Sequence, residues 1–282
     1  MELLAKAVPV ALLVFVVSSM LAVGLSLTVG QILAPLRNAR LVILSLVANF
    51  VLMPLAALLI ARMLRLDQPL AVALLLLGGA AGAPFLPKLA GVAGGNLAFA
   101  VGLMVLLMVL TVGYMPLVIP LLLEGVSVDP TQIARSLVLL MLLPLVVGLA
   151  VRARFAVVAG RVAPVLNKVS TLSLTIMVLL MLVTNLRSII GLYGTRGVLA
   201  SLAFLLVGFG LGWLLGGPAR DTRSVLAMGT AQRNIAAALL VGGQNFEDPQ
   251  VVVMVVVVAI VGLLVLMPLG GRVAGLASEP TR

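Results

Sequence analysis

The sequence contains no cysteine and no histidine among its 282 residues. Disulfide bridges, thiolate nucleophiles, histidine metal ligands and serine–histidine catalytic triads are therefore excluded. Charged residues make up only 9% of the chain, whereas an ordinary soluble domain carries about 25%. So few charged groups cannot cover a water-facing globule.

Acidic residues are missing from every long apolar stretch, because each Asp and Glu lies near the end of one. An intramembrane enzyme needs a nucleophile or metal ligands at membrane depth. A serine–lysine pair is the one combination left, and no serine lies near Lys88 in the sequence. We therefore do not expect an enzyme.

Apolar residues account for 63% of the chain and are gathered in long blocks. Blocks such as 7–29, 41–60 and 251–269 approach the roughly 20 residues that span a bilayer as a helix. The alternating pattern of a transmembrane β-barrel is absent. The sequence predicts an all-α polytopic membrane protein, and the first block is interpreted as a retained helix because no small-residue cleavage site follows it.

Glycine, proline and charged residues separate about nine apolar blocks. We expect transmembrane helices at 7–29, 41–61, 70–92, 96–123, 132–153, 164–188, 197–216, 223–243 and 250–272. The connections are too short to hold a second domain. Residues 1–282 are therefore expected to form a single transmembrane domain.

The net charge of +10 is scattered over the ends of the apolar blocks and forms no basic stripe, which argues against a nucleic-acid partner. With the N-terminus outside, ten basic residues face inward: Arg37, Arg40, Arg152, Arg154, Arg161, Lys168, Arg220, Arg223, Arg272 and Arg282. Six face outward: Lys6, Arg62, Arg65, Arg135, Arg187 and Arg196. The positive-inside rule thus predicts an outer N-terminus and a cytoplasmic C-terminus.

Only Lys88 and Arg233 lie inside apolar blocks, and both blocks are interrupted. The first contains Pro84 and Pro87, which remove backbone donors and are expected to break the helix. The second contains the polar run 230–234. Two interrupted segments in corresponding places of two halves indicate a transporter binding site, because freed backbone groups need protein or a wet cavity around them.

Four stretches together resemble the bile acid:sodium symporter family. Residues 22–27 (Ala-Val-Gly-Leu-Ser-Leu) are similar to its Gly-Leu-Thr-Leu helix end, and 49–54 (Asn-Phe-Val-Leu-Met-Pro) to its Gln-Phe-x-x-Met-Pro. The run 73–96 matches the first crossing-helix segment through its final Gly-Asn, and 232–234 falls in the Glu-x-Gly-x-Gln-Asn region of the second. The resemblance covers nearly the whole chain and lacks only the first helix of ten-helix members.

The resemblance implies an inverted repeat, here four plus five helices, with repeat one at about 7–124 and repeat two at about 131–275. It also implies a panel domain and a core domain, with two broken helices crossing in the core. Substrates of the family are organic anions such as bile acids, sulfated steroids and pantoate, usually moved with sodium.

The sequence departs from the family at the first sodium site. The family's oxygen ligands there fall on Leu86, Pro87, Ala100, Met104 and Met228, or on Ala227 or Gly229 if the last register slips by one. Sodium, like other hard cations, prefers oxygen ligands, which these side chains lack. A residual second site built from Asn49, Gln232 and backbone carbonyls stays open, and no other cofactor is expected.

The candidate substrate-binding residues are Arg233, Gln232, Asn234, Thr230, Lys88 and Asn49. The buried cations either replace the missing sodium charge, or Arg233 clamps a substrate carboxylate. The alternatives are that Lys88 snorkels to the interface, that Asn49 bonds between helices, and that Thr230 and Asn234 cap half-helices. Thr111 and Tyr114, before Pro116, are expected to fill a kink.

The functional expectation is a secondary transporter of small organic anions, bile-acid-like or pantoate-like carboxylates, that works by alternating access and without the usual two-site sodium coupling. A sodium symporter with one residual site, a non-transporting sensor or scaffold, and a channel are the alternatives; the channel lacks a repeated filter or a ring of charges. The expected partners are the anion and the lipid bilayer, and the oligomeric state stays open.

Overall fold

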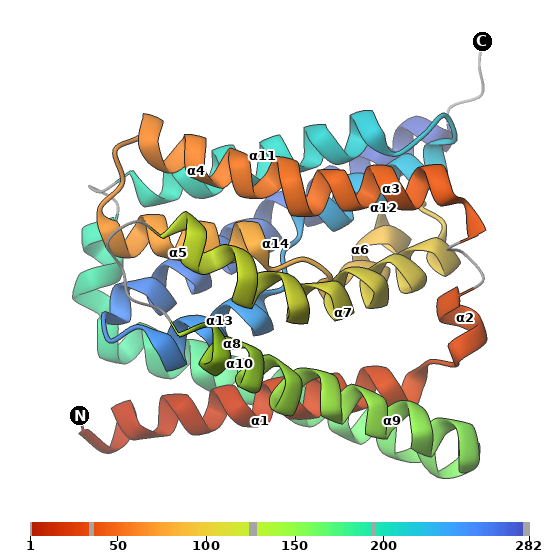
Figure 1. Ribbon diagram of the computed structural model, residues 1–282, viewed down its shortest axis with the longest axis horizontal. Helices are drawn as coiled ribbons and strands as arrows, with labels where there is room; N and C mark the ends of the chain where they lie inside the picture. Colours follow the sequence, from red (N-terminus) through yellow and green to blue (C-terminus); the bar gives the residue numbers. More distant parts are fainter. Residues whose placement is uncertain (1, 34–36, 124–128, 193–195, 279–282) are drawn as a thin grey trace.

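The described part of the chain is helical and contains no strand. A computed structural model describes residues 2–33, 37–123, 129–192 and 196–278 (Figure 1). Its elements are α1 (Glu2–Ser26), α2 (Val29–Leu33), α3 (Ala39–Val47), the π-helix η2 (Ala48–Leu52), α4 (Met53–Met63), α5 (Gln68–Gly79), α6 (Leu86–Val92), α7 (Leu97–Leu122), α8 (Pro130–Leu137), the π-helix η3 (Val138–Leu142), α9 (Leu143–Arg154), α10 (Ala156–Leu192), α11 (Gly197–Leu215), α12 (Arg220–Ala231), α13 (Ile235–Asn245) and α14 (Pro249–Ser278). The all-α class is confirmed.

Seven described segments are long and apolar enough to cross a membrane. They are 7–26, 39–63, 97–122, 130–154, 197–215, 220–245 and 249–275, while α5 is a shorter apolar helix. The chain is therefore an integral multi-pass membrane protein. The count of nine helices, the inverted repeat and the orientation of the termini stay predictions.

The helices are arranged in layers (Figure 1). Helix α1 packs lengthwise against α9 and α10, and these three lie along one edge of the molecule. At the opposite edge lie α3, α4 and α11, and between the two edges run α5, α6, α7, α12, α13 and α14. The interrupted helices thus lie in the middle layer, where their backbone is covered on both sides.

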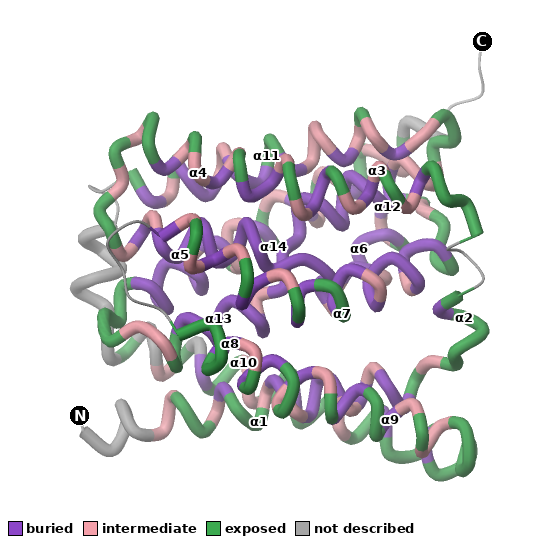
Figure 2. Tube along the Cα trace, in the orientation of Figure 1, coloured by how far each residue is buried: buried purple, intermediate pink, exposed green. Residues whose placement is uncertain are grey.

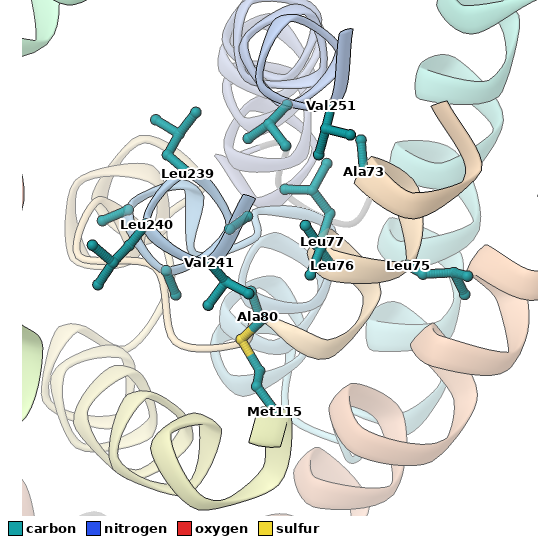
Figure 3. Packing of buried hydrophobic residues seen from close by; sticks show 14 of the residues in the cluster. Ala73, Leu75, Leu76, Leu77, Ala80, Met115, Leu239, Leu240, Val241 and Val251 are labelled. Atoms are coloured by element: carbon teal, nitrogen blue, oxygen red, sulfur yellow. The ribbon is translucent and has the colours of Figure 1, made fainter. Parts of the chain in front are cut away.

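Apolar packing in the middle layer joins α5, α13 and α14. Leu76, Leu77, Leu240 and Val251 are almost completely buried, and Figure 3 shows them in one cluster. Because lipid tails are as apolar as leucine, such contacts stabilise the fold through close packing rather than through removal from water. Figure 2 shows the same middle helices as the most continuously buried part of the chain.

The first predicted break is confirmed, with one correction. Helix α5 ends at Gly79 and α6 begins at Leu86. Pro87 was expected to help break the helix, but it lies in the first turn of α6, where the absence of an N–H has no cost. Gly82, at φ +79°, makes the turn, and a Cβ there would lie 2.6 Å from the Met108 Cα. Only glycine fits both constraints.

The second predicted break is confirmed as well. Helix α12 ends at Ala231, and α13 begins at Ile235 after three non-helical residues. The segment 220–245 that contains this break has the largest buried share of the seven spans. Its open backbone groups are therefore surrounded by protein, as membrane depth requires.

Three glycines at four-residue spacing let α11 approach α12 closely. A Cβ on Gly212 would lie 2.6 Å from the Ala227 Cα, and Cβ atoms on Gly208 and Gly216 would also press on the α12 backbone. Small residues at this spacing are a common means of close helix packing in membranes. They fix the first half of the second broken helix against α11.

We expect Gly212→Ala to lower the stability of the protein by about 1–3 kcal/mol, because backbone atoms of α12 would have to move away. Gly210→Ala on the same helix is the matched control, since nothing lies within 4 Å of a Cβ there. That control should be neutral or stabilising, because alanine favours a helix by about 0.5–1 kcal/mol over glycine. Thermal unfolding in detergent measures both, and equal midpoints would contradict the close approach.

Candidate functional site

The two broken segments meet at the centre of the middle layer. The Asn234 backbone N–H donates to the Ala80 carbonyl at 2.9 Å, which joins the second break directly to the first. Asn49, in η2, and Thr230, in the last turn of α12, lie at the same place and are fully buried. We call Asn49, Thr230, Arg233 and the carbonyls they meet the crossing cluster.

Arg233 is the centre of this cluster and is only 1% exposed. All five of its N–H donors have oxygen acceptors. The bonds are Nε to Leu77 O (2.8 Å), Nη1 to Asn49 Oδ1 (2.6 Å) and Thr230 O (3.3 Å), and Nη2 to Gly78 O (2.6 Å) and Asn49 O (3.3 Å). A guanidinium has five donors in a fixed fork, so its hydrogen-bonding capacity is used completely.

Most of these acceptors are backbone carbonyls that lack an α-helical donor, because a helix ends or is distorted there. Leu77 and Gly78 are in the last turn of α5, and Thr230 is in the last turn of α12. The last four carbonyls of a helix have no α-helical partner of their own. Both helix ends also carry partial negative charge, which favours a cation.

Pro54 frees the carbonyls of Asn49 and Phe50. Proline has no N–H, so Phe50 O loses its partner four residues ahead. The Met53 N–H bonds to Ala48 O in the π-helical turn, so it does not reach Asn49 O. Asn49 O accepts from Arg233 instead, and Phe50 O accepts from the Tyr114 hydroxyl at 2.6 Å.

No carboxylate forms an ion pair with Arg233 in the described part of the chain. Its charge is compensated by the neutral oxygens of Asn49, Leu77, Gly78 and Thr230. Hydrogen bonds from a charged group contribute roughly 1.5–3 kcal/mol each, more than bonds between neutral groups. Arg233 thus binds the end of α12 to η2 and α5, which lie more than 150 residues earlier in the sequence.

Asn49 and Thr230 complete the crossing cluster. The Asn49 Nδ2 donates to Ser45 O at 3.0 Å and to Thr230 Oγ1 at 3.3 Å, while its Oδ1 is taken by Arg233. The asparagine therefore bonds across helices and also supplies an oxygen to the cation. The expected interhelical bond of Asn49 is thus present, and its role as a ligand for a substrate or an ion stays a prediction.

The side chains of Gln232 and Asn234 point in other directions than the side chain of Arg233 between them. The backbone is extended at Gln232 (ψ 114°), so neighbouring side chains alternate in direction. The Gln232 Oε1 lies beside Gly262 of α14, and its amide has no hydrogen-bond partner among the residues that the structure describes. It is thus brought near the crossing cluster without joining Asn49.

Asn234 caps α13, as one of the two expectations had it. Its Oδ1 accepts from the Ala237 N–H at 3.1 Å. Its Nδ2 is fully enclosed and has no partner within the described residues. A buried amide donor without a partner is costly, so this nitrogen is suited to a ligand or water that offers an oxygen.

Lys88 is not brought into the cluster. It is exposed on α6, with its Nζ 5.2 Å from the centre of the Phe85 ring. A lysine in this position covers apolar surface with its stem and keeps its ammonium group outside the core. Of the two cations within apolar blocks, only Arg233 is buried.

Thr111 and Tyr114 were expected only to fill a kink, and this expectation was incomplete. Helix α7 continues through Pro116, and the two side chains bond to other segments. The Thr111 Oγ1 accepts from the Ala81 N–H at 3.0 Å and donates to the Ala81 carbonyl at 3.1 Å. The Tyr114 hydroxyl donates to Phe50 O, in another segment. The unpaired carbonyl before Pro54 was the one sequence signal for such a partner.

The positions that the sequence resemblance assigns to a first sodium site lie in an apolar cluster. Leu86, Ala100, Met104 and Met228 are at most 2% exposed and belong to one group of packed side chains. A Cβ on Gly229 would lie 3.0 Å from a Leu86 methyl group, so leucine fills the space beside that glycine. No side-chain oxygen comes from these four residues.

A comparison with known families now places the chain. The family described as Sodium Bile acid symporter family matches residues 11–192, which is more than half of the chain. The chain belongs to the sodium bile acid symporter family. No curated protein matches it closely enough to compare.

Membership of the sodium bile acid symporter family identifies the chain as a membrane transporter of that general type rather than an enzyme. The matched range includes Asn49, the first broken helix and α7. The second broken helix, with Arg233, lies beyond it. The family relationship and the Arg233 cluster are therefore largely separate observations.

Replacing Arg233 by methionine should destabilise the protein by at least about 3 kcal/mol, because the buried Asn49 and Gly78 carbonyls and the Asn49 side-chain oxygen lose their donor at once. Lys88→Met removes the same charge from an exposed position and should stay within about 0.5 kcal/mol of the wild type. Chemical or thermal unfolding in detergent compares the two. Similar losses for both variants would contradict the structural role of Arg233.

Thr111→Val keeps the side-chain shape but leaves the Ala81 N–H and carbonyl without partners. We expect a loss of about 1–3 kcal/mol in unfolding free energy. Thr175→Val is the control, because that hydroxyl bonds only to the carbonyl of Thr171 in its own helix. If both valine variants unfold like the wild type, Thr111 does not hold the first break.

Proposed function

We propose that the protein is a secondary transporter of small organic anions that works by alternating access without sodium, with Arg233 as a fixed cation at the crossing. The observation that carries this proposal is the complete use of the Arg233 donors by oxygens of Asn49, Leu77, Gly78 and Thr230.

Two features support independence from sodium. Carbonyl and amide oxygens are the ligands that a hard cation such as sodium would use, and those at the crossing already bind a permanently charged guanidinium. The positions expected for the first sodium site hold Leu86, Ala100, Met104 and Met228, whose side chains offer no oxygen. The residues present therefore do not fit the usual two sodium ions.

The same geometry argues against Arg233 as a carboxylate clamp. A bidentate clamp needs two N–H groups that point to the substrate. Those of Arg233 all point to the protein, and breaking these bonds would leave buried carbonyls unpaired. In this proposal Arg233 holds the crossing together and does not touch the substrate.

Asn234 is the better candidate for contact with the anion. Its unpartnered Nδ2 lies at the N-terminus of α13, where first-turn N–H groups and the helix dipole favour negative charge. A carboxylate or sulfate oxygen would satisfy this donor. Bile-acid-like and pantoate-like carboxylates are the proposed substrate class, and Thr230 and Gln232 border the same break.

The proposed movement divides the helices into two bodies. Helices α1, α9 and α10 would belong to the panel domain, in agreement with their close mutual packing, and the interrupted helices to the core domain. The two would rock against each other as halves of an inverted repeat. The basic residues at the helix ends support an outer N-terminus and a cytoplasmic C-terminus.

Uptake into proteoliposomes tests the proposal. A labelled bile acid, a sulfated steroid and pantoate would each be offered with a sodium gradient and with choline in its place. We expect saturable uptake of at least one anion at the same rate in both conditions, and counter-transport of the unlabelled anion. Collapse of uptake in choline would instead support a residual sodium site at Asn49 and Gln232.

Flux that rises linearly with anion concentration, without counter-transport, would indicate a channel. Absence of flux for every anion would indicate a sensor or scaffold. Arg233→Lys serves beside the wild type because it keeps the charge but loses the planar fork. We expect it to fold less stably and to transport more slowly, still without a response to sodium.

Asn234→Asp should abolish anion uptake while the protein still folds. Aspartate keeps the oxygen that caps α13, but replaces the Nδ2 donor by a negative charge that repels the substrate. Asn38→Asp makes the same exchange at the start of α3, where the side chain also caps the helix, and should leave uptake intact. Unchanged uptake in Asn234→Asp would remove Asn234 from the substrate site.

A further inference from the structure

A second site lies at one end of the molecule, away from the crossing. A cavity of about 270 Å³, open to the outside, is lined by the end of α4, the start of α5 and the end of α7. Its lining shares no residue with the crossing cluster, and Leu75, which points away from the α5–α13 contact in Figure 3, belongs to it. Nothing in the transport proposal uses this cavity.

The lining has two chemically different parts. The walls are apolar side chains from all three helices, among them Leu58, Leu75 and Leu122. The rim carries Arg62, Arg65 and Gln68, which are exposed. No acidic side chain lines the cavity in the described part of the chain, although Asp67 lies next to the rim in the sequence and is exposed.

Arg65 occupies a backbone position that normally favours glycine. It follows the C-terminus of α4 with φ +48°, and the next residue closes the helix end by donating from Leu66 N to Ala61 O at 3.0 Å. Glycine is the usual residue at this place because it adopts a left-handed conformation without strain. An arginine there puts a cation at the cavity rim in spite of the strained backbone.

The cavity lies where membrane helices end. Helix α4 ends at Met63, which is 80% exposed, α5 begins at Gln68, and α7 ends at Leu122. The ends of spanning helices lie near the boundary between hydrocarbon and head groups. Arginines at this level meet lipid phosphates, and leucines one turn deeper meet acyl chains.

We propose that this cavity binds an anionic phospholipid, with the phosphate between Arg62 and Arg65 and the beginning of an acyl chain along Leu58 and Leu75. Its volume is slightly below the roughly 300 Å³ at which small-molecule pockets begin, so it holds part of a lipid rather than a whole one. Arg62 and Arg65, which both line the cavity, carry the charge opposite to that of a phosphate, and the apolar walls match the chain. This site is independent of the proposed transport mechanism.

Thermal unfolding of the full-length protein in a non-ionic detergent tests the proposal. Phosphatidylglycerol and phosphatidylcholine with the same acyl chains are added in turn to the wild type and to the Arg62→Gln/Arg65→Gln variant. Arg135→Gln is the matched control, because it removes an arginine from α8 that does not line the cavity. Inorganic phosphate and dodecyl phosphate are added to separate samples.

We expect phosphatidylglycerol to raise the unfolding temperature by several degrees more than phosphatidylcholine in the wild type and in Arg135→Gln. This difference should fall by at least half in the double variant, and native mass spectrometry should show fewer retained anionic lipids. If the double variant folds poorly, Arg65→Gln alone carries the comparison.

Three results would overturn the proposal. The first is equal stabilisation of the wild type by the two lipids. The second is a difference in unfolding temperature between the two lipids that is as large in the arginine variants as in the wild type. The third is full stabilisation by dodecyl phosphate or inorganic phosphate without any by phosphatidylglycerol, which would assign the cavity to a free anion instead of a bilayer lipid.

Discussion

The arrangement of the middle layer depends on one buried cation and the carbonyls that it satisfies. Broken helices leave backbone oxygens without partners at membrane depth, where water cannot solvate them. Arg233 meets these oxygens from η2, α5 and α12 with its five donors, so the cost of each broken helix end is offset by the same side chain. The guanidinium in turn needs these oxygens, because a buried charge without partners is expensive. Arg233 and the Asn234 N–H therefore connect the two breaks.

The neighbouring residues extend this dependence outward. Thr111 joins the first break to α7 through its hydrogen bonds to Ala81. Tyr114 donates to the Phe50 carbonyl, which has no backbone donor because of Pro54. The glycines of α11 bring that helix onto the backbone of α12, next to the second break. What remains free is the Nδ2 of Asn234, at the N-terminus of α13. In the proposed function this donor is the contact with the anion, and the crossing cluster keeps its own hydrogen bonds.

The membrane class, both helix breaks and the burial of Arg233 could be predicted from the sequence, because hydropathy, proline and isolated charge act locally. Most partners of Arg233 could not, since they belong to Asn49, Leu77 and Gly78, more than 150 residues away along the chain, and several of them are backbone carbonyls. The different directions of Gln232 and Arg233 follow from the extended backbone at the break, which residue types alone do not reveal. For Lys88 the sequence left a buried and a snorkelling position open, because the outward side of the short helix α6 depends on its packing against α7, α12 and α14.

The most direct test of the central claim is the effect of sodium on thermal unfolding of the wild type and of Arg233→Ala in detergent, with choline as the reference cation. If Arg233 occupies the place of an ion, sodium should leave the wild type unchanged and should stabilise the variant, whose freed oxygens at Asn49, Leu77 and Gly78 become available to a cation. Stabilisation of the wild type by sodium, equal to or larger than that of the variant, would contradict the account.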